Sequence, residues 1–154
     1  MAVAILPAGS LLVEVDRRRR QVCEMTQNYV RWHTPHLSRY FEMLVFGHTG
    51  HPVIVFPTAL GRYYEAKDCG LIEPLAPLVE PGRLAVFCPD GIDAQSWHNR
   101  AIHPADRVRT YLGFENVIRH DVLPRALQQT GRARVAVVGA GFGAYHAANF
   151  AFRH

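Results

Sequence analysis

The stretch RVAVVGAGFGAYHAANFAFRH, residues 134–154, decides the fold. Its first five residues, Arg134–Val138, form a short apolar run of the kind found in strands buried on both faces. Glycines follow at positions 139, 141 and 143, and apolar residues then recur at roughly helical spacing. The stretch therefore predicts a strand, a tight turn and a helix. Glycine permits positive φ and close packing in such a turn, and the first N–H groups of the helix can hold an anion or an oxyanion.

Two known designs share this geometry and predict different chemistry. The nucleophile elbow of α/β-hydrolases has the pattern G-x-S-x-G. The frame from Gly139 to Gly143 fits it, but Gly141 stands at the serine position. The dinucleotide fingerprint G-x-G-x-x-G/A is satisfied by Gly139, Gly141 and Ala144. The local sequence favours the dinucleotide design, so the rest of the chain must decide between the two.

Length and composition indicate one globular domain with a sizeable core. The chain has 154 residues, is 49% hydrophobic and 19% charged, and carries a net charge of +4. Part of that charge is the run Arg17–Arg20, which we interpret as solvated surface, and nucleic-acid binding is not indicated. The three cysteines show no paired spacing and predict free thiols in a reducing compartment. No apolar run reaches about 20 residues, so we expect no membrane span and a cytoplasmic protein.

Buried strands alternate with helices along most of the chain. Residues 1–27 are predicted to be an N-terminal segment, and residues 28–154 a single domain. Expected strands are 11–15 in the segment, 29–32 and 40–46 as an antiparallel edge pair, and then 53–56, 84–88 and 134–138. Helices are expected over 68–79, kinked by prolines, and over 105–129. This order predicts an α/β fold, a mainly parallel sheet with antiparallel N-terminal edge strands and helices on both faces.

The position of the glycines separates the two designs. A dinucleotide fold carries its glycine fingerprint after the first strand, and an acidic residue about 20 positions further on binds the ribose. Here the glycines follow the last predicted strand, and no acidic residue follows them in the sequence. In α/β-hydrolases the elbow follows several strands, as it does here. We therefore expect strand 53–56 to lie between two parallel neighbours, strands 84–88 and 134–138.

Several segments resemble the esterase D-like family of α/β-hydrolases. The resemblance extends over about residues 28–154, with matching order and spacing. Its segments are LVFGHTGHPVIVFP (Leu44–Pro57), LGRYYE (Leu60–Glu65), FCPD (Phe87–Asp90), Ser96-Trp97 and DVLP (Asp121–Pro124). It implies a serine esterase that hydrolyses carboxylic esters with a Ser-Asp/Glu-His triad, and it makes Gly139–Gly143 the elbow.

This chain departs from that pattern, and an oxyanion pocket is what remains. Gly141 has no side chain with which to attack a substrate, and the strands that would bring the acid and the histidine do not follow in this sequence. One oxyanion donor would be the N–H of Phe142, and the other an N–H near Ala59 or Leu60 in the loop after strand 53–56. Trp97 could line this pocket or equally cover the core.

Other residues offer weaker candidates for chemistry. We expect His146 to be a core or surface residue of the elbow helix and Cys88 to be a buried thiol. Ser96 has no activating base that the sequence identifies. The pairs His33/His36 and His48/His51 have no nearby cysteine or carboxylate at ligand spacing, so no metal and no cofactor are predicted.

The sequence thus predicts an incomplete α/β-hydrolase domain of the esterase type, inactive alone. The alternative is a non-catalytic binding or scaffolding module on this fold, and a weaker alternative is FAD or NAD binding through Gly139, Gly141 and Ala144. A small acyl ester is a candidate ligand. We also expect association through the unpaired edge of Arg134–Val138, either with a second copy or with a separate chain. Folding back of Leu11–Val15 over that edge is the alternative.

Overall fold

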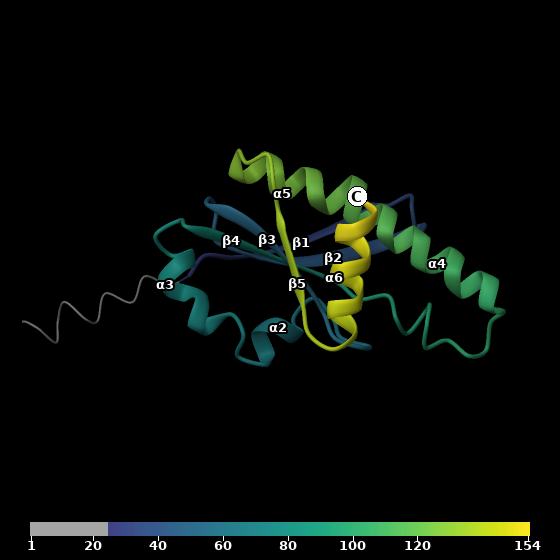
Figure 1. Ribbon diagram of the computed structural model, residues 1–154. Coiled ribbons are helices and arrows are strands. Elements are labelled where there is room, and N and C mark those ends of the chain that lie inside the picture. Colours follow the sequence, from purple (N-terminus) through teal and green to yellow (C-terminus); the bar gives the residue numbers. More distant parts are fainter. Residues whose placement is uncertain (1–24) are drawn as a thin grey trace, which may run out of the picture.

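A mixed sheet of five strands forms the centre of the molecule (Figure 1). The computed structural model describes residues 25–154, so the predicted strand Leu11–Val15 lies outside the described residues. The spatial order is β1-β2-β4-β3-β5. The strands are β1 (Gln27–Thr34), β2 (Arg39–Phe46), β3 (His51–Phe56), β4 (Leu84–Pro89) and β5 (Ala136–Gly139).

The strand directions confirm the predicted arrangement of the sheet. Strand β2 is antiparallel to both β1 and β4, whereas β3 is parallel to both β4 and β5. Strand β3 therefore lies between its two parallel neighbours, as the sequence predicts. The register pairs Ile54 with Phe87 on one side and with Val137 on the other.

One face of the sheet is covered by a long helical stretch and by the last helix. Helix α4 (Pro104–Val117) continues through the π-helical turn η2 (Ile118–Val122) into α5 (Leu123–Thr130), and α6 (Phe142–Arg153) packs on the same face. The π turn ends just before Pro124, which cannot donate a backbone hydrogen bond in a regular α-helix. The predicted helix over 105–129 is thus present, with this one irregularity. Buried side chains beneath it include Phe41, Ile54, Phe56, Phe87, Phe114, Ile118 and Phe150.

The opposite face is covered by short helical pieces where one kinked helix over 68–79 was expected. These pieces are α2 (Glu65–Asp68), the 3-10 turn η1 (Glu73–Leu75) and α3 (Ala76–Val79). The prediction is wrong because Gly70 takes a φ of +72°, and Pro74 and Pro77 each begin a new piece. Apolar residues of the pieces still reach the sheet, and helical elements therefore lie on both faces. This second cluster contains Leu44, Phe46, Val55, Ile72, Val79, Val86 and Cys88.

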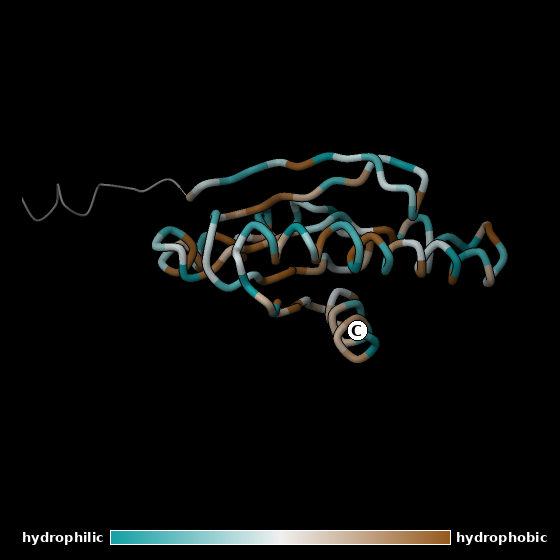
Figure 2. Tube along the Cα trace, turned by 90° about the horizontal axis from the view of Figure 1, so that it is seen from above, coloured by the Kyte–Doolittle hydropathy of each residue, from teal (hydrophilic) through white to brown (hydrophobic). Residues whose placement is uncertain are grey.

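Strand β5 forms one edge of the described sheet. Among residues 25–154 it pairs only with β3. The strand covers Ala136–Gly139, two residues later than the predicted start at Arg134. Figure 2 shows α6 at this side of the molecule, beyond the rest of the sheet. The chain turns from β5 into α6, so the elbow lies at the same edge.

Candidate functional site

The turn from β5 into α6 has the backbone geometry of a nucleophile elbow. Gly141 takes φ +54° and ψ −121°, a conformation that residues with a side chain adopt only under strain. A Cβ at Gly141 would meet nothing within 4 Å, whereas a Cβ at Gly139 would lie 2.3 Å from the Gly143 carbonyl. The outer two glycines are therefore required for packing, and position 141 faces open space. This is where an elbow presents its nucleophile.

Unpaired backbone amides belong to both segments predicted to form the oxyanion pocket. Within the described part of the chain, the N–H of Phe142 has no hydrogen-bond acceptor, and neither do those of Ala59 and Leu60, the two candidates for the second donor. Phe142 begins α6, where the helix dipole favours negative charge. A Cβ at Gly143 would lie 2.5 Å from the Pro57 carbonyl oxygen, so the first turn of α6 packs against the start of the Ala59 loop. The role of these amides as oxyanion donors stays a prediction.

The loop that carries Ala59 and Leu60 is held in place by charged side chains. The Thr58 backbone N–H donates to a Glu65 carboxylate oxygen at 2.7 Å. Arg62 contacts the buried Asp90 carboxylate at 2.6 Å and Glu42 at 2.8 Å. The hydrogen bond to Asp90 raises the pKa of the Arg62 guanidinium. These contacts tie the loop to strand β2 and to Asp90, the residue that follows β4.

Leu60 is a strained position in this loop. It has a φ of +62°, which is unusual for a residue with a branched side chain, and its side chain is exposed. Sequence reasoning located the loop but missed both this strain and the Arg62–Asp90 contact, because the partners lie 28 residues apart.

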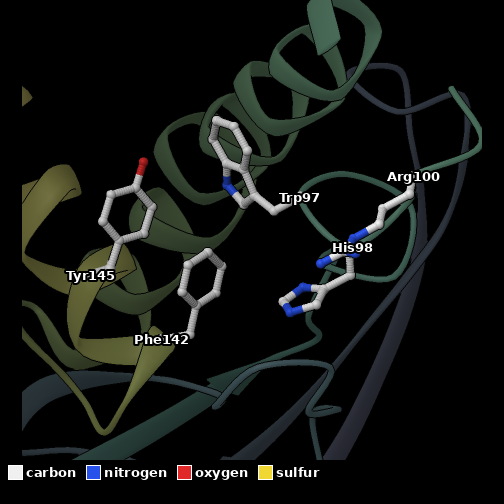
Figure 3. A pocket seen from close by; sticks show the side chains of 5 residues that line it. All are labelled: Trp97, His98, Arg100, Phe142 and Tyr145. Carbon is white, nitrogen blue, oxygen red and sulfur yellow. The ribbon is translucent and has the colours of Figure 1, made fainter. Parts of the chain in front are cut away.

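A cavity of about 370 Å³, widely open to solvent, lies beside the elbow (Figure 3). Trp97, Phe142 and Tyr145 form its aromatic walls, and His98 and Arg100 lie opposite them. The rings of Phe142 and Tyr145 are stacked with centroids 5.1 Å apart. The two interpretations of Trp97 are both consistent with its position, since its ring lines this cavity and also lies 5.1 Å from the buried Tyr111 ring.

His146 belongs to a buried polar pair that the sequence did not reveal. Its Nε2 lies 3.0 Å from Oδ1 of Asp93, and both side chains are almost completely buried. The rings of Phe142 and Tyr111 pack around the imidazole at 4.8 and 5.6 Å. His146 is thus a core residue, as expected, and it connects α6 to the segment after β4. No sequence pattern could have found the pair, because its members are 53 residues apart.

The remaining candidate residues are dispersed. Ser96 is buried, and its hydroxyl donates to the Ile92 carbonyl at 3.0 Å. Burial raises the pKa of the Cys88 thiol to about 12, which leaves it protonated and unreactive at neutral pH. The His36 ring lies 5.4 Å from the His120 ring on the surface. Within residues 25–154, no group of three or more His, Cys, Asp or Glu side chains is placed to hold a metal ion.

Comparison with solved structures identifies the architecture. The chain superposes on an S-formylglutathione hydrolase from Agrobacterium tumefaciens with a TM-score of 0.56 at 18% identity, covering 83% of this chain and 53% of that one. S-formylglutathione hydrolase FrmB from Staphylococcus aureus matches with a TM-score of 0.52 at 15% identity, covering 84% of this chain and 52% of that one. A ferulic acid esterase matches with a TM-score of 0.62 at 15% identity, covering 84% of this chain and 55% of that one. The fold is part of an α/β-hydrolase fold.

These matches confirm the predicted resemblance to esterase D-like proteins at the level of the fold. This chain spans about half the length of the solved structures that it matches. No family model matches the sequence, and a search of curated proteins gives no match. In the described residues, no helix has the length and apolar character needed to cross a bilayer.

Proposed function

We propose that this chain carries an esterase-type α/β-hydrolase site without its nucleophile and is inactive alone. The observation that supports this is Gly141, whose backbone conformation and open surroundings are those of an elbow nucleophile but whose side chain is absent. The unpaired amides of Phe142 and Ala59 would still polarise the carbonyl of a small acyl ester. The site would therefore bind such an ester without cleaving it.

The expected loss of activity is large. Removing the nucleophile of a well-studied serine hydrolase lowers kcat about 10⁶-fold. The buried His146 is bonded to Asp93 and packed among aromatic rings, so it offers no base at the open side of Gly141. We propose that no other side chain of the described residues replaces the missing triad.

Hydrolysis of 4-nitrophenyl acetate tests this proposal. The unmodified chain should give no rate above buffer, and Gly141→Ser should not restore one because base and acid are also missing. Gly141→Ala is the matched control, since it introduces the same backbone strain without the hydroxyl. Saturable turnover by the unmodified chain would contradict the proposal.

A non-catalytic interaction module is the second candidate, and the β5 edge favours it. Val138 on β5 is 43% exposed, and Phe152 on α6 is 90% exposed. Strand β5 contains no proline and no charged residue, the features that commonly protect sheet edges from association. We propose that this edge pairs with a second copy or with a separate chain.

The weaker alternative of dinucleotide binding has a simple test. It would use Gly139, Gly141 and Ala144, and a bound flavin would be visible in the absorbance spectrum of the purified protein. The proposed cytoplasmic location rests on composition and cysteine usage alone.

A further inference from the structure

One face of the hairpin formed by β1 and β2 carries exposed rings beside arginine. Side chains alternate along a strand, and the register places Tyr29, Arg31 and His33 of β1 on the same face as Tyr40 and Glu42 of β2; we call this the hairpin face. Tyr29 and Tyr40 are 51% and 55% exposed. We propose that the hairpin face binds single-stranded nucleic acid, with bases stacked on the tyrosine rings and phosphates held by arginine.

The helical pieces on this side of the sheet do not cover the hairpin face. Leu44 and Phe46 of β2 are buried beneath them, whereas Tyr40 on the same strand is exposed. Strand β1 forms the edge of the described sheet opposite β5, and Figure 2 shows the hairpin along the side of the molecule opposite α6. The hairpin face is thus separate from the elbow. Esterase activity or inactivity at Gly141 therefore neither supports nor contradicts this proposal.

The rings of the hairpin face form a platform for stacking. The Arg31 guanidinium lies over the Tyr40 ring at 4.2 Å from its centroid, and the His33 ring meets Tyr40 edge-on at 5.6 Å. The Tyr29 ring continues the aromatic surface toward Tyr63, with centroids 5.6 Å apart. Every base has a flat face that stacks on an aromatic ring or on a guanidinium plane. These contacts order the platform before a ligand arrives.

The charge of the hairpin favours a polyanion. Within residues 25–154, neither Arg31 nor Arg39 forms an ion pair. Glu42 is the only acidic residue of the two strands, and Arg62 pairs with it at 2.8 Å. A hollow of about 370 Å³ at the turn of the hairpin is lined by Arg39 and by no acidic residue. Phosphates along a strand would therefore meet positive charge that is not already paired.

The arginine run Arg17–Arg20 lies close to this hairpin in the sequence. Only residues 21–26 separate it from β1. No aromatic residue is interleaved with the run, so the run does not by itself indicate nucleic-acid binding. The pairing of β1 with β2 supplies what the run lacks, because it brings Tyr29 and Tyr40 onto one face. Binding should weaken as the salt concentration rises, since phosphate contacts release counterions.

Fluorescence anisotropy of a labelled oligo(dT) of about 12 nucleotides, titrated with the full chain, tests the proposal. We expect a Kd on the order of 10 µM at about 50 mM salt. Tyr40→Leu should weaken binding about tenfold without changing its salt dependence, because a stacking ring is lost, whereas Tyr40→Phe keeps the ring and the affinity. Arg31→Gln should weaken binding about threefold and lower the slope of log Kd against log salt by about 0.7. Both side chains are exposed, so neither change should disturb folding.

Matched controls separate the hairpin face from general effects. Phe152→Ala removes a ring that is 90% exposed on α6, and Arg132→Gln removes an exposed charge elsewhere; both should leave the Kd unchanged. A blunt duplex of the same length hides its bases and should bind at least about fivefold more weakly. Phosphatidylserine vesicles at equal charge, which represent an anionic membrane, should not displace the oligonucleotide.

Four outcomes would overturn the proposal. They are the absence of saturable binding, a duplex that binds as tightly as the oligonucleotide, displacement by the vesicles, and Tyr40→Leu and Arg31→Gln variants that bind like the two controls.

Discussion

Strands β4 and β5 are both apolar and both run parallel to β3, yet they differ in how much of them is covered. Ala85, Val86 and Phe87 on β4 are 0% exposed, whereas Val138 on β5 is 43% exposed. The difference comes from their neighbours, since β4 has a strand on either side and helical elements on both faces. The comparison teaches that apolar composition alone does not separate a central strand from an edge strand.

The elbow and the cavity beside it lie at the less covered strand, β5. Two polar contacts hold α6 there, the buried His146–Asp93 pair and an ion pair of 2.7 Å between the partly exposed Arg153 and Glu115. Glu115 is itself buried on α4. The helix that carries the site is thus attached to the central region by these polar contacts and by the packing of Ala147 and Phe150 in the core. Removing these contacts by substitution tests whether α6 and the central sheet unfold as one unit.

Asp93→Ala should produce the largest effect. It leaves the buried His146 imidazole with neither ring nitrogen paired, because Nδ1 already lacks a partner in the described residues. We expect the free energy of unfolding to fall by about 3 kcal/mol. Urea denaturation measures the change. Asp106→Ala is the control, as its exposed pair with Arg109 should contribute less than about 1 kcal/mol. Equal losses would show that the buried pair does not hold α6.

Val86→Ala and Val138→Ala test the comparison directly with the same chemical change. The β4 substitution leaves a cavity at a residue with no exposed surface and should cost about 2 kcal/mol. The β5 substitution removes methyl groups that are already half in water and should cost less than about 1 kcal/mol. Both values come from urea denaturation. If the two losses are equal, β5 is covered by something outside the described residues.

Val138→Lys tests association through the β5 edge. A charged side chain at the edge should disfavour strand pairing and weaken association about tenfold, measured by sedimentation velocity over a range of concentrations. Val108→Lys is the matched control, because Val108 is 42% exposed but lies on helix α4 and not on the β5 edge. A monomeric unmodified chain whose edge stays unpaired would refute the proposed association.

Alkaline pH should weaken the central region by a smaller amount. Burial raises the pKa of Cys88 from 9.0 to about 12 in the folded chain. Above pH 9 the unfolded chain loses this proton and the folded chain keeps it, so the stability from Cys88 is complete below pH 9 and is lost as pH rises toward 12. We expect a loss of about 1 kcal/mol at pH 10.

Cys88→Ala should remove the loss that begins at pH 9. A further loss should remain above pH 10, because burial also raises the pKa of Tyr111 from 10.0 to about 12. Urea denaturation at pH 8 and pH 10 measures the loss from Cys88, and a third series at pH 11 measures the loss from Tyr111. An unchanged pH dependence in Cys88→Ala would contradict the assignment.

Sequence reasoning predicted those parts of the fold that depend on local pattern. Three apolar runs between turn residues located β3, β4 and β5, the strand order of α/β-hydrolases placed β3 between the other two, and the glycine spacing located the elbow. The prediction of one helix over 68–79 was wrong, because apolar residues at helical spacing cannot keep a helix continuous through Gly70 and two prolines. The Asp93–His146 and Arg62–Asp90 contacts were missed because tertiary structure alone brings these residues together.

The backbone conformation at position 141 makes a change from glycine to serine more costly than the reverse. At φ +54° a serine would be strained by about 1–3 kcal/mol, a cost that function can offset when its hydroxyl performs a reaction. Without that reaction, glycine relieves the strain and leaves the neighbouring packing intact, since nothing lies within 4 Å of the absent Cβ. Replacement of serine by glycine here is energetically downhill, and the reverse step is uphill. The backbone at position 141 therefore favours glycine over serine unless the serine hydroxyl is needed for a reaction.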